Sequence, residues 1–94
     1  MTDKMVHRLI GYDRETEELA WQHDIPEAKL TVVKKIAKVD ANDSDAIGSY
    51  ELTASQAREI AGIIQQPINT RKYIFYLEPF AAALTKQMNI GRLG

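Results

Sequence analysis

The chain has 94 residues, the length of one small domain. Hydrophobic residues make up 45% of it and charged residues 27%, a balance that argues against intrinsic disorder. The absence of cysteine excludes a disulfide framework, a thiolate nucleophile and every cysteine-based zinc site. We expect a single domain over residues 1–94, with frayed ends at 1–4 and 89–94.

The net charge is −1, but the acidic and basic residues are grouped in separate blocks along the sequence. Residues 1–27 hold seven acids and three bases, 28–39 four lysines, 40–51 four acids, and 67–94 four bases and one acid, which gives blocks of −4, +4, −4 and +3. Such blocks favour internal pairing of the acidic segment with the basic one. Without an overall basic excess, nucleic acid is not favoured as a partner.

Targeting and membrane signals are missing from the sequence. Residues 1–4 lack the apolar stretch of a signal peptide, and no run approaches the ~20 apolar residues of a membrane span. We expect a cytoplasmic protein with no membrane partner.

The first elements predicted are two strands. Residues 5–12 are rich in β-branched and aromatic side chains, and Leu19, Trp21 and Ile25 alternate with polar residues. Together they predict a β-hairpin. A helix over residues 15–22 is the alternative, because its acidic residues suit a first helical turn.

Pro26 suits the first position of a helix, and an amphipathic helix is predicted over residues 27–39. Its lysines cover the outer surface. The residues expected to face the core are Leu30, Val33, Ile36 and Ala37.

Residues 40–48 have turn composition and predict the main loop, which is followed by a strand over 49–52. A second helix is predicted over 53–65. Its start is marked by Thr53 and Gln56, whose side chains suit a reciprocal capping box. The residues expected to face inward are Ala57, Ile60, Ala61 and Ile64.

The apolar and aromatic run at residues 73–77 predicts a fourth strand that ends at Glu78 and Pro79, while a helix over 72–78 is the alternative. Residues 80–88 suit an optional final helix. The order β-β-α-β-α-β therefore predicts an α+β fold, a small, mostly antiparallel sheet with two helices on one face. The strand residues expected to face the core are Tyr73, Phe75 and Leu77.

His7 and His23 are the two histidines of the chain. A hairpin register that pairs positions summing to 30 would place them opposite each other, as the start of a metal site. Because such a site needs three or four protein ligands, we expect no metal. The favoured interpretation is two partly exposed histidines at a strand end.

Catalytic patterns are also weak. The acidic residues of the predicted hairpin tip lack the burial that shifts a carboxyl pKa for acid–base chemistry. The serines have no nucleophile-elbow context, and the glycines form no phosphate-binding loop. We expect a non-enzymatic protein with no catalytic residue and no cofactor.

Two charged segments are candidates for binding. Residues 71–76 interleave bases with aromatic side chains as single-strand platforms do, but a strand there leaves one tyrosine on its outer side, where a platform needs two or three aromatics. The acidic segment fits a basic protein partner better. The partner-binding residues predicted on this basis are Asp40, Asp43, Asp45 and Glu51.

Three pieces of the sequence carry a resemblance. The first is Gly-Tyr-Asp at 11–13 and Thr-Glu-Glu-Leu at 16–19, leading to Ile-Pro at 25–26. The second is Tyr-Glu-Leu-Thr at 50–53 followed by Gln-Ala at 56–57, and the third is Tyr73 followed by Tyr-Leu-Glu at 76–78. In this the chain resembles small, largely uncharacterised single-domain bacterial proteins, some of which look like immunity proteins of toxin–immunity pairs. The shared features are a turn, a helix cap and an aromatic strand. The resemblance implies a bacterial interaction protein and assigns no catalytic residue.

The sequence therefore predicts a protein-binding module, most concretely an immunity protein that neutralises a basic toxin domain by charge complementarity. One alternative is a module that forms a homodimer through the edge of the fourth strand or residues 80–84. The other is a small nucleic-acid binder that uses Lys34, Lys35, Arg71 and Lys72.

Overall fold

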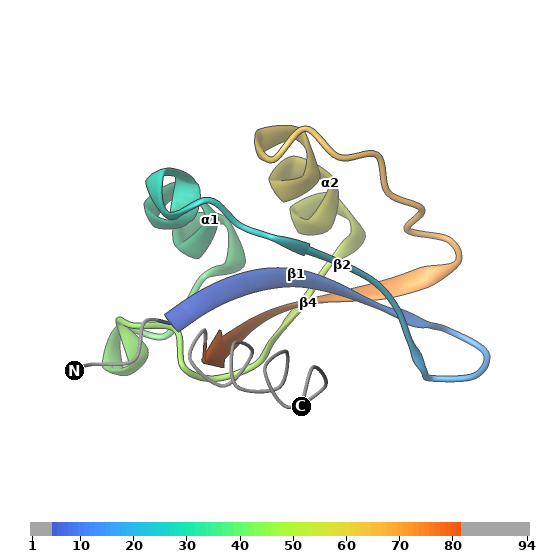
Figure 1. Cartoon of the computed structure of the whole chain (residues 1–94), viewed down its shortest axis with the longest axis horizontal. Coiled ribbons are helices and arrows are strands. Elements are labelled where there is room, and N and C mark those ends of the chain that lie inside the picture. Colours follow the sequence, from blue (N-terminus) through green and yellow to red (C-terminus); the bar gives the residue numbers. More distant parts are fainter. Residues whose placement is uncertain (1–4, 82–94) are drawn as a thin grey trace, which may run out of the picture.

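The computed structural model describes residues 5–81, which form a four-stranded antiparallel sheet with two α-helices on one face (Figure 1). This confirms the predicted α+β class and the β-β-α-β-α-β order. The elements are β1 (Met5–Asp13), β2 (Leu19–Asp24), the 3₁₀ turn η1 (Glu27–Lys29), α1 (Leu30–Ala37), the 3₁₀ turn η2 (Ala41–Asp43), β3 (Tyr50–Leu52), α2 (Ala54–Ile63) and β4 (Tyr73–Ala81).

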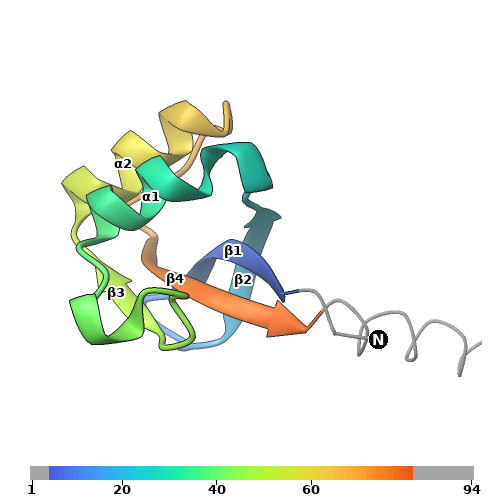
Figure 2. The ribbon, with the colours of Figure 1, turned by 90° about the vertical axis from the view of Figure 1, so that its left-hand side faces the viewer.

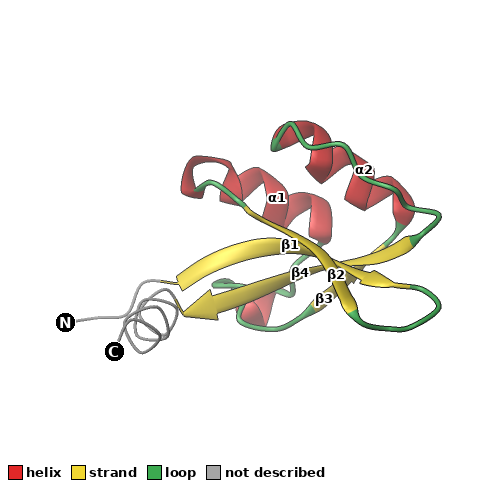
Figure 3. Cartoon of the chain, turned by 45° about the vertical axis from the view of Figure 1, so that its right-hand side comes forward, coloured by secondary structure: helices red, strands yellow, loops and turns green. Residues whose placement is uncertain are grey.

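The strand order is β2-β1-β4-β3, so the first and last strands of the chain pair at the centre of the sheet (Figure 3). The β1–β4 ladder runs without a shift from Met5 opposite Ala81 to Asp13 opposite Tyr73. Because β4 pairs with β3 on its other side, it is an interior strand. Self-association through its edge, as the sequence allowed, is wrong along the segment that β3 covers.

The core fills the space between the sheet and the two helices, which lie side by side in Figure 2. Phe75 and Leu77 of β4 and Leu9 of β1 point into it and are fully buried. Tyr73 packs against the same cluster. The inward faces predicted for both helices are confirmed. The helix residues in or against the core are Leu30, Val33, Ile36, Ala37, Ala57 and Ile60. Ala61 and Ile64, the C-cap of α2, are also buried.

A hairpin joins β1 and β2, so the alternative helix over residues 15–22 is wrong. The reason is the Asp13 carboxylate, which accepts the amides of Glu15 (2.8 Å) and Thr16 (3.0 Å). Such an Asx turn offers the backbone a tight reversal in place of a helical turn. Trp21 and Ile25 then face the core as predicted, whereas Leu19 is exposed.

β4 continues through Pro79, so the expectation that Glu78 and Pro79 end it is wrong. Pro79 lies opposite His7 in the β1–β4 ladder, and the His7 carbonyl accepts the Ile25 amide on the β2 side (2.8 Å). The Pro79 nitrogen therefore points away from β1, on the side where β3 has ended, and no ladder hydrogen bond is lost.

The predicted final helix over residues 80–88 is wrong at its first two positions, because Phe80 and Ala81 belong to β4. The rest of it, and the expected frayed ends at 1–4 and 89–94, lie outside the described residues.

The first helix is shorter than predicted. Its opening turn, η1, is a 3₁₀ helix, and α1 ends at Ala37 because Lys38 adopts a left-handed backbone (φ 57°). The second helix spans 54–63 with Thr53 as its N-cap, close to the prediction.

The predicted capping box is present. The Thr53 hydroxyl accepts the Gln56 amide (3.1 Å), and the Gln56 side chain accepts the Thr53 amide (2.8 Å). The Gln56 side chain also donates to the Ile36 carbonyl near the end of α1 (2.8 Å). The cap therefore fixes the β3–α2 junction and joins the two helices.

Removing this cap should destabilise the domain. Thr53→Ala leaves the Gln56 amide without its acceptor, and we expect a loss of about 1 kcal/mol in the free energy of unfolding. Ser55→Ala is the matched control, because Ser55 is exposed and does not cap the helix. Urea denaturation of both variants measures the difference, and equal midpoints for Thr53→Ala and the wild type would contradict the role of the cap.

Gly11 marks the closest approach between β1 and the core. A Cβ atom at this position would lie 2.9 Å from Cε1 of Phe75. Since Phe75 is 2% exposed and contacts Trp21 edge to face (5.7 Å), its ring has little room to move. A glycine is therefore required where β1 passes beneath the aromatic core.

We expect Gly11→Ala to destabilise the domain by about 1–3 kcal/mol through overpacking. Gly62→Ala is the control of opposite sign: a Cβ there meets nothing within 4 Å, and alanine in a helix is favoured over glycine by about 0.5–1 kcal/mol. Thermal unfolding of the two variants tests whether the melting temperature falls for Gly11→Ala and rises for Gly62→Ala. A stable Gly11→Ala protein would show that the Phe75 ring can yield.

Candidate functional site

The two faces of the sheet differ, because among residues 5–81 the helices cover one face and leave the other uncovered (Figures 1 and 3). We call the uncovered side the open face. Alternation along the strands places its residues opposite the core residues. The open face includes Arg8, Ile10, Tyr12, Gln22, Asp24, Glu51, Ile74, Tyr76, Glu78 and Phe80. Of these, Ile10 is fully buried.

Four open-face residues form a tyrosine–glutamate cluster, made of Tyr12, Tyr76, Glu51 and Glu78. The two rings meet edge to face with centroids 5.4 Å apart. The Tyr12 hydroxyl donates to both Glu78 oxygens at 3.3 Å, and the Tyr76 hydroxyl donates to Glu51 at 3.4 Å. Glu78 also accepts the Ser49 hydroxyl at 2.8 Å. Both carboxylates are therefore held by neutral hydroxyl donors.

The pKa values of both tyrosines in this cluster are raised above the usual value. Burial and then the nearby Glu78 carboxylate raise the pKa of Tyr12. Burial and then the Glu51 carboxylate raise the pKa of Tyr76 in the same way. Burial and the glutamates both disfavour an anionic tyrosinate here, and of the two only the charge of the glutamates would attract a cation.

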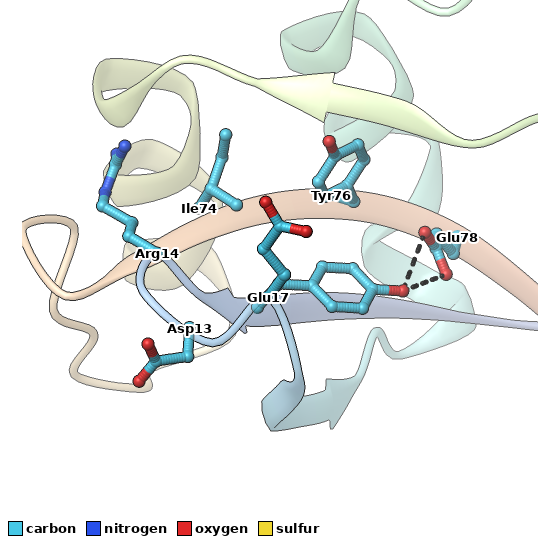
Figure 4. A pocket seen from close by; sticks show the side chains of 7 residues that line it. Asp13, Arg14, Glu17, Ile74, Tyr76 and Glu78 are labelled. Atoms are coloured by element: carbon cyan, nitrogen blue, oxygen red, sulfur yellow. Dashed lines mark hydrogen bonds between the residues drawn. The ribbon is translucent and has the colours of Figure 1, made fainter.

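A cavity of about 560 Å³ lies beside the cluster at the hairpin end of the open face (Figure 4). It opens to solvent, and three of the four charged residues that line it are acidic. The residues that line it are Tyr12, Asp13, Arg14, Glu17, Ile74, Tyr76 and Glu78.

The arginines of this region are engaged elsewhere. Arg14 donates to the Thr70 carbonyl at 3.1 Å, and its side chain lies at the end of the cavity opposite Glu78 (Figure 4). Arg8 forms an ion pair with Asp24 at 2.7 Å and lies over the Phe80 ring at 4.5 Å. Although Arg8 is directly opposite Glu78 in the ladder, its charge is directed to β2.

The acidic loop, residues 40–48, is ordered by Asp43. The Asp43 carboxylate accepts the Tyr50 hydroxyl (2.6 Å) and the amides of Ile47 and Gly48 (both 2.9 Å). These hydrogen bonds, that of Tyr50 first, hold the pKa of Asp43 below its usual value. Asp43 is therefore a clamp within the loop rather than a free surface charge.

The other predicted partner-binding residues are less constrained. Asp40 is exposed and accepts the Asn42 amide at 2.7 Å as the N-cap of η2. Asp45 is exposed, and its main-chain oxygen lies 3.1 Å from the His7 ring. Glu51 is separated from both, since it lies on the open face. The structure thus divides the predicted set between the acidic loop and the tyrosine–glutamate cluster.

The expected pairing of the acidic loop with the lysines of the first helix is wrong for the described residues, where these groups form no ion pair. Lys34 instead donates to the main-chain oxygen of Ser44 at 2.7 Å. The carboxylates of Asp40 and Asp43 accept amides and a hydroxyl, so the Lys34 contact attaches the loop to α1 without neutralising it.

His7 differs from the prediction. The hairpin register places Leu9, not His7, opposite His23, so the facing histidine pair is wrong. His7 is 5% exposed, which also corrects its predicted exposure at a strand end. Its Nε2 donates to the carbonyls of Asp45 (3.1 Å) and Ala46 (3.0 Å) and ties the acidic loop to β1. In residues 5–81, no three histidine or carboxylate side chains gather as metal ligands.

The sequence missed Tyr12 and Glu78. It predicted one tyrosine on the outer side of β4, but the β1–β4 ladder brings Tyr12 beside Tyr76. The alternation of residues 8, 10 and 12 along β1 indicates that Tyr12 lies on the outer side of that strand. To place Tyr12 beside Tyr76, however, one must know that β1 pairs with β4, and these two tyrosines are more than 60 residues apart in the chain.

None of the helices in residues 5–81 is long and apolar enough to span a membrane.

The clamp at Asp43 predicts a pH dependence. Because its folded pKa is depressed, it stabilises the fold above about pH 3.9, the usual value of an unfolded aspartate, and this contribution is lost as pH falls through the folded pKa. We expect Asp43→Asn to have a lower melting temperature than the wild type at pH 7. The difference between the two melting temperatures should shrink as the pH falls toward 2.

Asp45→Asn removes one charge from the same loop but leaves the clamp intact, and its melting temperature should follow that of the wild type. Thermal scans of the three proteins between pH 7 and pH 2 make the comparison. A difference in melting temperature between Asp43→Asn and the wild type that stays constant over this pH range would contradict the prediction that the Asp43 carboxylate stabilises the fold only when it is ionised.

A family model described as a domain of unknown function, DUF7683, matches residues 7–78. Because the match covers most of the chain, the chain belongs to this family. The matched region includes the whole tyrosine–glutamate cluster. No curated protein and no solved structure matches the chain.

Proposed function

We propose that the chain is a non-enzymatic protein-binding module whose open face docks a basic surface of another protein. The observation that carries this proposal is the state of Glu51 and Glu78. Within residues 5–81, their carboxylates are hydrogen-bonded by the hydroxyls of Ser49, Tyr12 and Tyr76 and pair with no cation. A partner protein that supplies a lysine or arginine side chain would form ion pairs with these carboxylates.

The composition of the open face supports a protein partner over nucleic acid. Tyrosines with a polar group at the ring end are enriched at protein interfaces, where they supply contact area at low entropic cost. Glu51 and Glu78 flank both rings of the cluster, and carboxylates at these positions would repel a phosphate backbone.

The most specific form of this proposal is an immunity protein in a bacterial cytoplasm. Its partner would be a toxin domain that cuts nucleic acid and therefore carries a basic cleft. Opposite charges on the two surfaces would accelerate their encounter and fix their orientation. The support for this form is the resemblance of the sequence segments together with the acidic character of the open face.

Charge reversal at Glu51 tests the proposal. The wild type, Glu51→Lys and Glu59→Lys are immobilised, and the proteins that each retains from the native host are identified. Both glutamates are exposed and both variants change the net charge by +2, but Glu59 lies on α2, away from the open face. We expect one basic protein to bind the wild type and Glu59→Lys and to associate about tenfold more slowly with Glu51→Lys at low salt.

Labelled duplex and single-stranded nucleic acids are titrated in parallel. If the wild type binds nucleic acid at micromolar concentration and Glu51→Lys binds it more tightly, the face is a nucleic-acid site and the proposal fails. Equal loss of the protein partner in both lysine variants would also contradict it, since the effect would then follow net charge and not the open face.

A further inference from the structure

The cavity beside the tyrosine–glutamate cluster has a more specific use, which rests on the proposed function. We propose that it receives one arginine side chain of the partner protein. The guanidinium group would lie against the rings of Tyr12 and Tyr76 and pair with the carboxylate of Glu78, while Glu17 closes the other side of the cavity.

The size and walls of the cavity suit this ligand. Its volume of about 560 Å³ falls within the ~300–1,000 Å³ of ordinary ligand sites. Ile74 supplies an apolar wall between Arg14 and Tyr76 (Figure 4). An arginine side chain combines an apolar stem with a charged end, and the cavity has the same division between Ile74 and the glutamates.

The aromatic rings supply the second requirement. Tyr12 and Tyr76 are nearly perpendicular, at 86°, with centroids 5.4 Å apart. They therefore form a corner in which a planar cation can lie over one ring face while its edge meets the other ring. A guanidinium within about 6 Å of a tyrosine centroid is attracted by the negative ring face.

The carboxylates supply the third requirement. Glu78 accepts long hydrogen bonds of 3.3 Å from Tyr12, which leave lone pairs free for a cation. Glu17 lines the cavity from the hairpin turn with a left-handed backbone (φ 63°). Its carboxylate adds a further negative charge to the lining on the side of the turn.

Arginine fits this arrangement better than lysine. Its guanidinium is planar, stacks on aromatic rings and presents a fork of donors to a carboxylate, whereas an ammonium group is compact and strongly hydrated. The chain's own Arg14 and Arg8 are engaged with Thr70 and Asp24. Neither therefore occupies the place beside Glu78.

The test uses the full chain and three small probes: N-acetyl-arginine amide, its neutral isostere N-acetyl-citrulline amide, and N-acetyl-lysine amide. Binding is followed by ¹⁵N-resolved NMR shifts. We expect the arginine probe to bind with a dissociation constant on the order of 1–10 mM, as a single side chain allows, and to shift the signals of Tyr12, Glu17 and Tyr76. The lysine probe should bind more weakly, and the citrulline probe should leave these signals unchanged.

Two variants locate the site. Glu78→Gln keeps an oxygen that accepts from Tyr12 and Ser49 but removes the charge, and it should weaken arginine binding about tenfold. Glu59→Gln on α2 is the matched control and should bind as the wild type does. Equal binding of arginine and citrulline, tighter binding of lysine, or wild-type affinity in Glu78→Gln would each overturn the inference.

Failure of this inference and failure of the proposed function give different results. If no arginine probe binds but Glu51→Lys still loses a basic protein partner, the arginine cavity is wrong and the docking face stands. If the arginine probe binds at Glu78 but no protein depends on Glu51, the cavity is a cation site and the proposed docking of a protein is wrong.

Discussion

The nine-residue ladder between β1 and β4 is the constraint on which the rest of the structure depends. Because side chains alternate along a strand, this register decides which residues enter the core and which reach the open face. In the observed register, Leu9 and Leu77 face the helices, whereas Tyr12 and Tyr76 face away. A slip of one residue would place Ile74 or Tyr76, according to its direction, where Phe75 now packs over Gly11. The fit between these two residues therefore fixes the core and the open face together.

Local chemistry explains why much of the fold is predictable from the sequence. The capping box of Thr53 and Gln56 lies within four residues, and the Asx turn at Asp13 lies within four as well. Amphipathic spacing predicts the buried faces of both helices because each face lies within one segment. The ends of elements are less predictable. β4 continues past Pro79 because β3 stops before it, and no local signal shows where a neighbouring strand stops.

The site is less predictable than the fold, because it is assembled from strands that are distant in the chain. Acidic composition identified the loop and Glu51 as one set, but the structure gives them different roles. The Asp43 carboxylate accepts hydrogen bonds from within the loop and from Tyr50, and the His7 side chain of β1 donates to two carbonyls of that loop. Glu78 looked like the last residue before a strand-ending proline, and became part of the site because its hydroxyl partners Tyr12 and Ser49 come from two other segments.

The hairpin register also sets the charge of the open face. Arg8 lies between two acidic neighbours, Asp24 on β2 and Glu78 on β4. A register two residues away, with positions summing to 30, would keep the same faces but place Gln22 opposite Arg8. Glu78 would then be the acidic residue directly across from Arg8, and an ion pair would neutralise it. In the observed register Asp24 accepts the guanidinium at 2.7 Å, so within residues 5–81 the Glu78 carboxylate is bonded by neutral hydroxyls and by no cation. Among these residues, the unpaired charge of Glu78 is a consequence of strand pairing and not of local sequence.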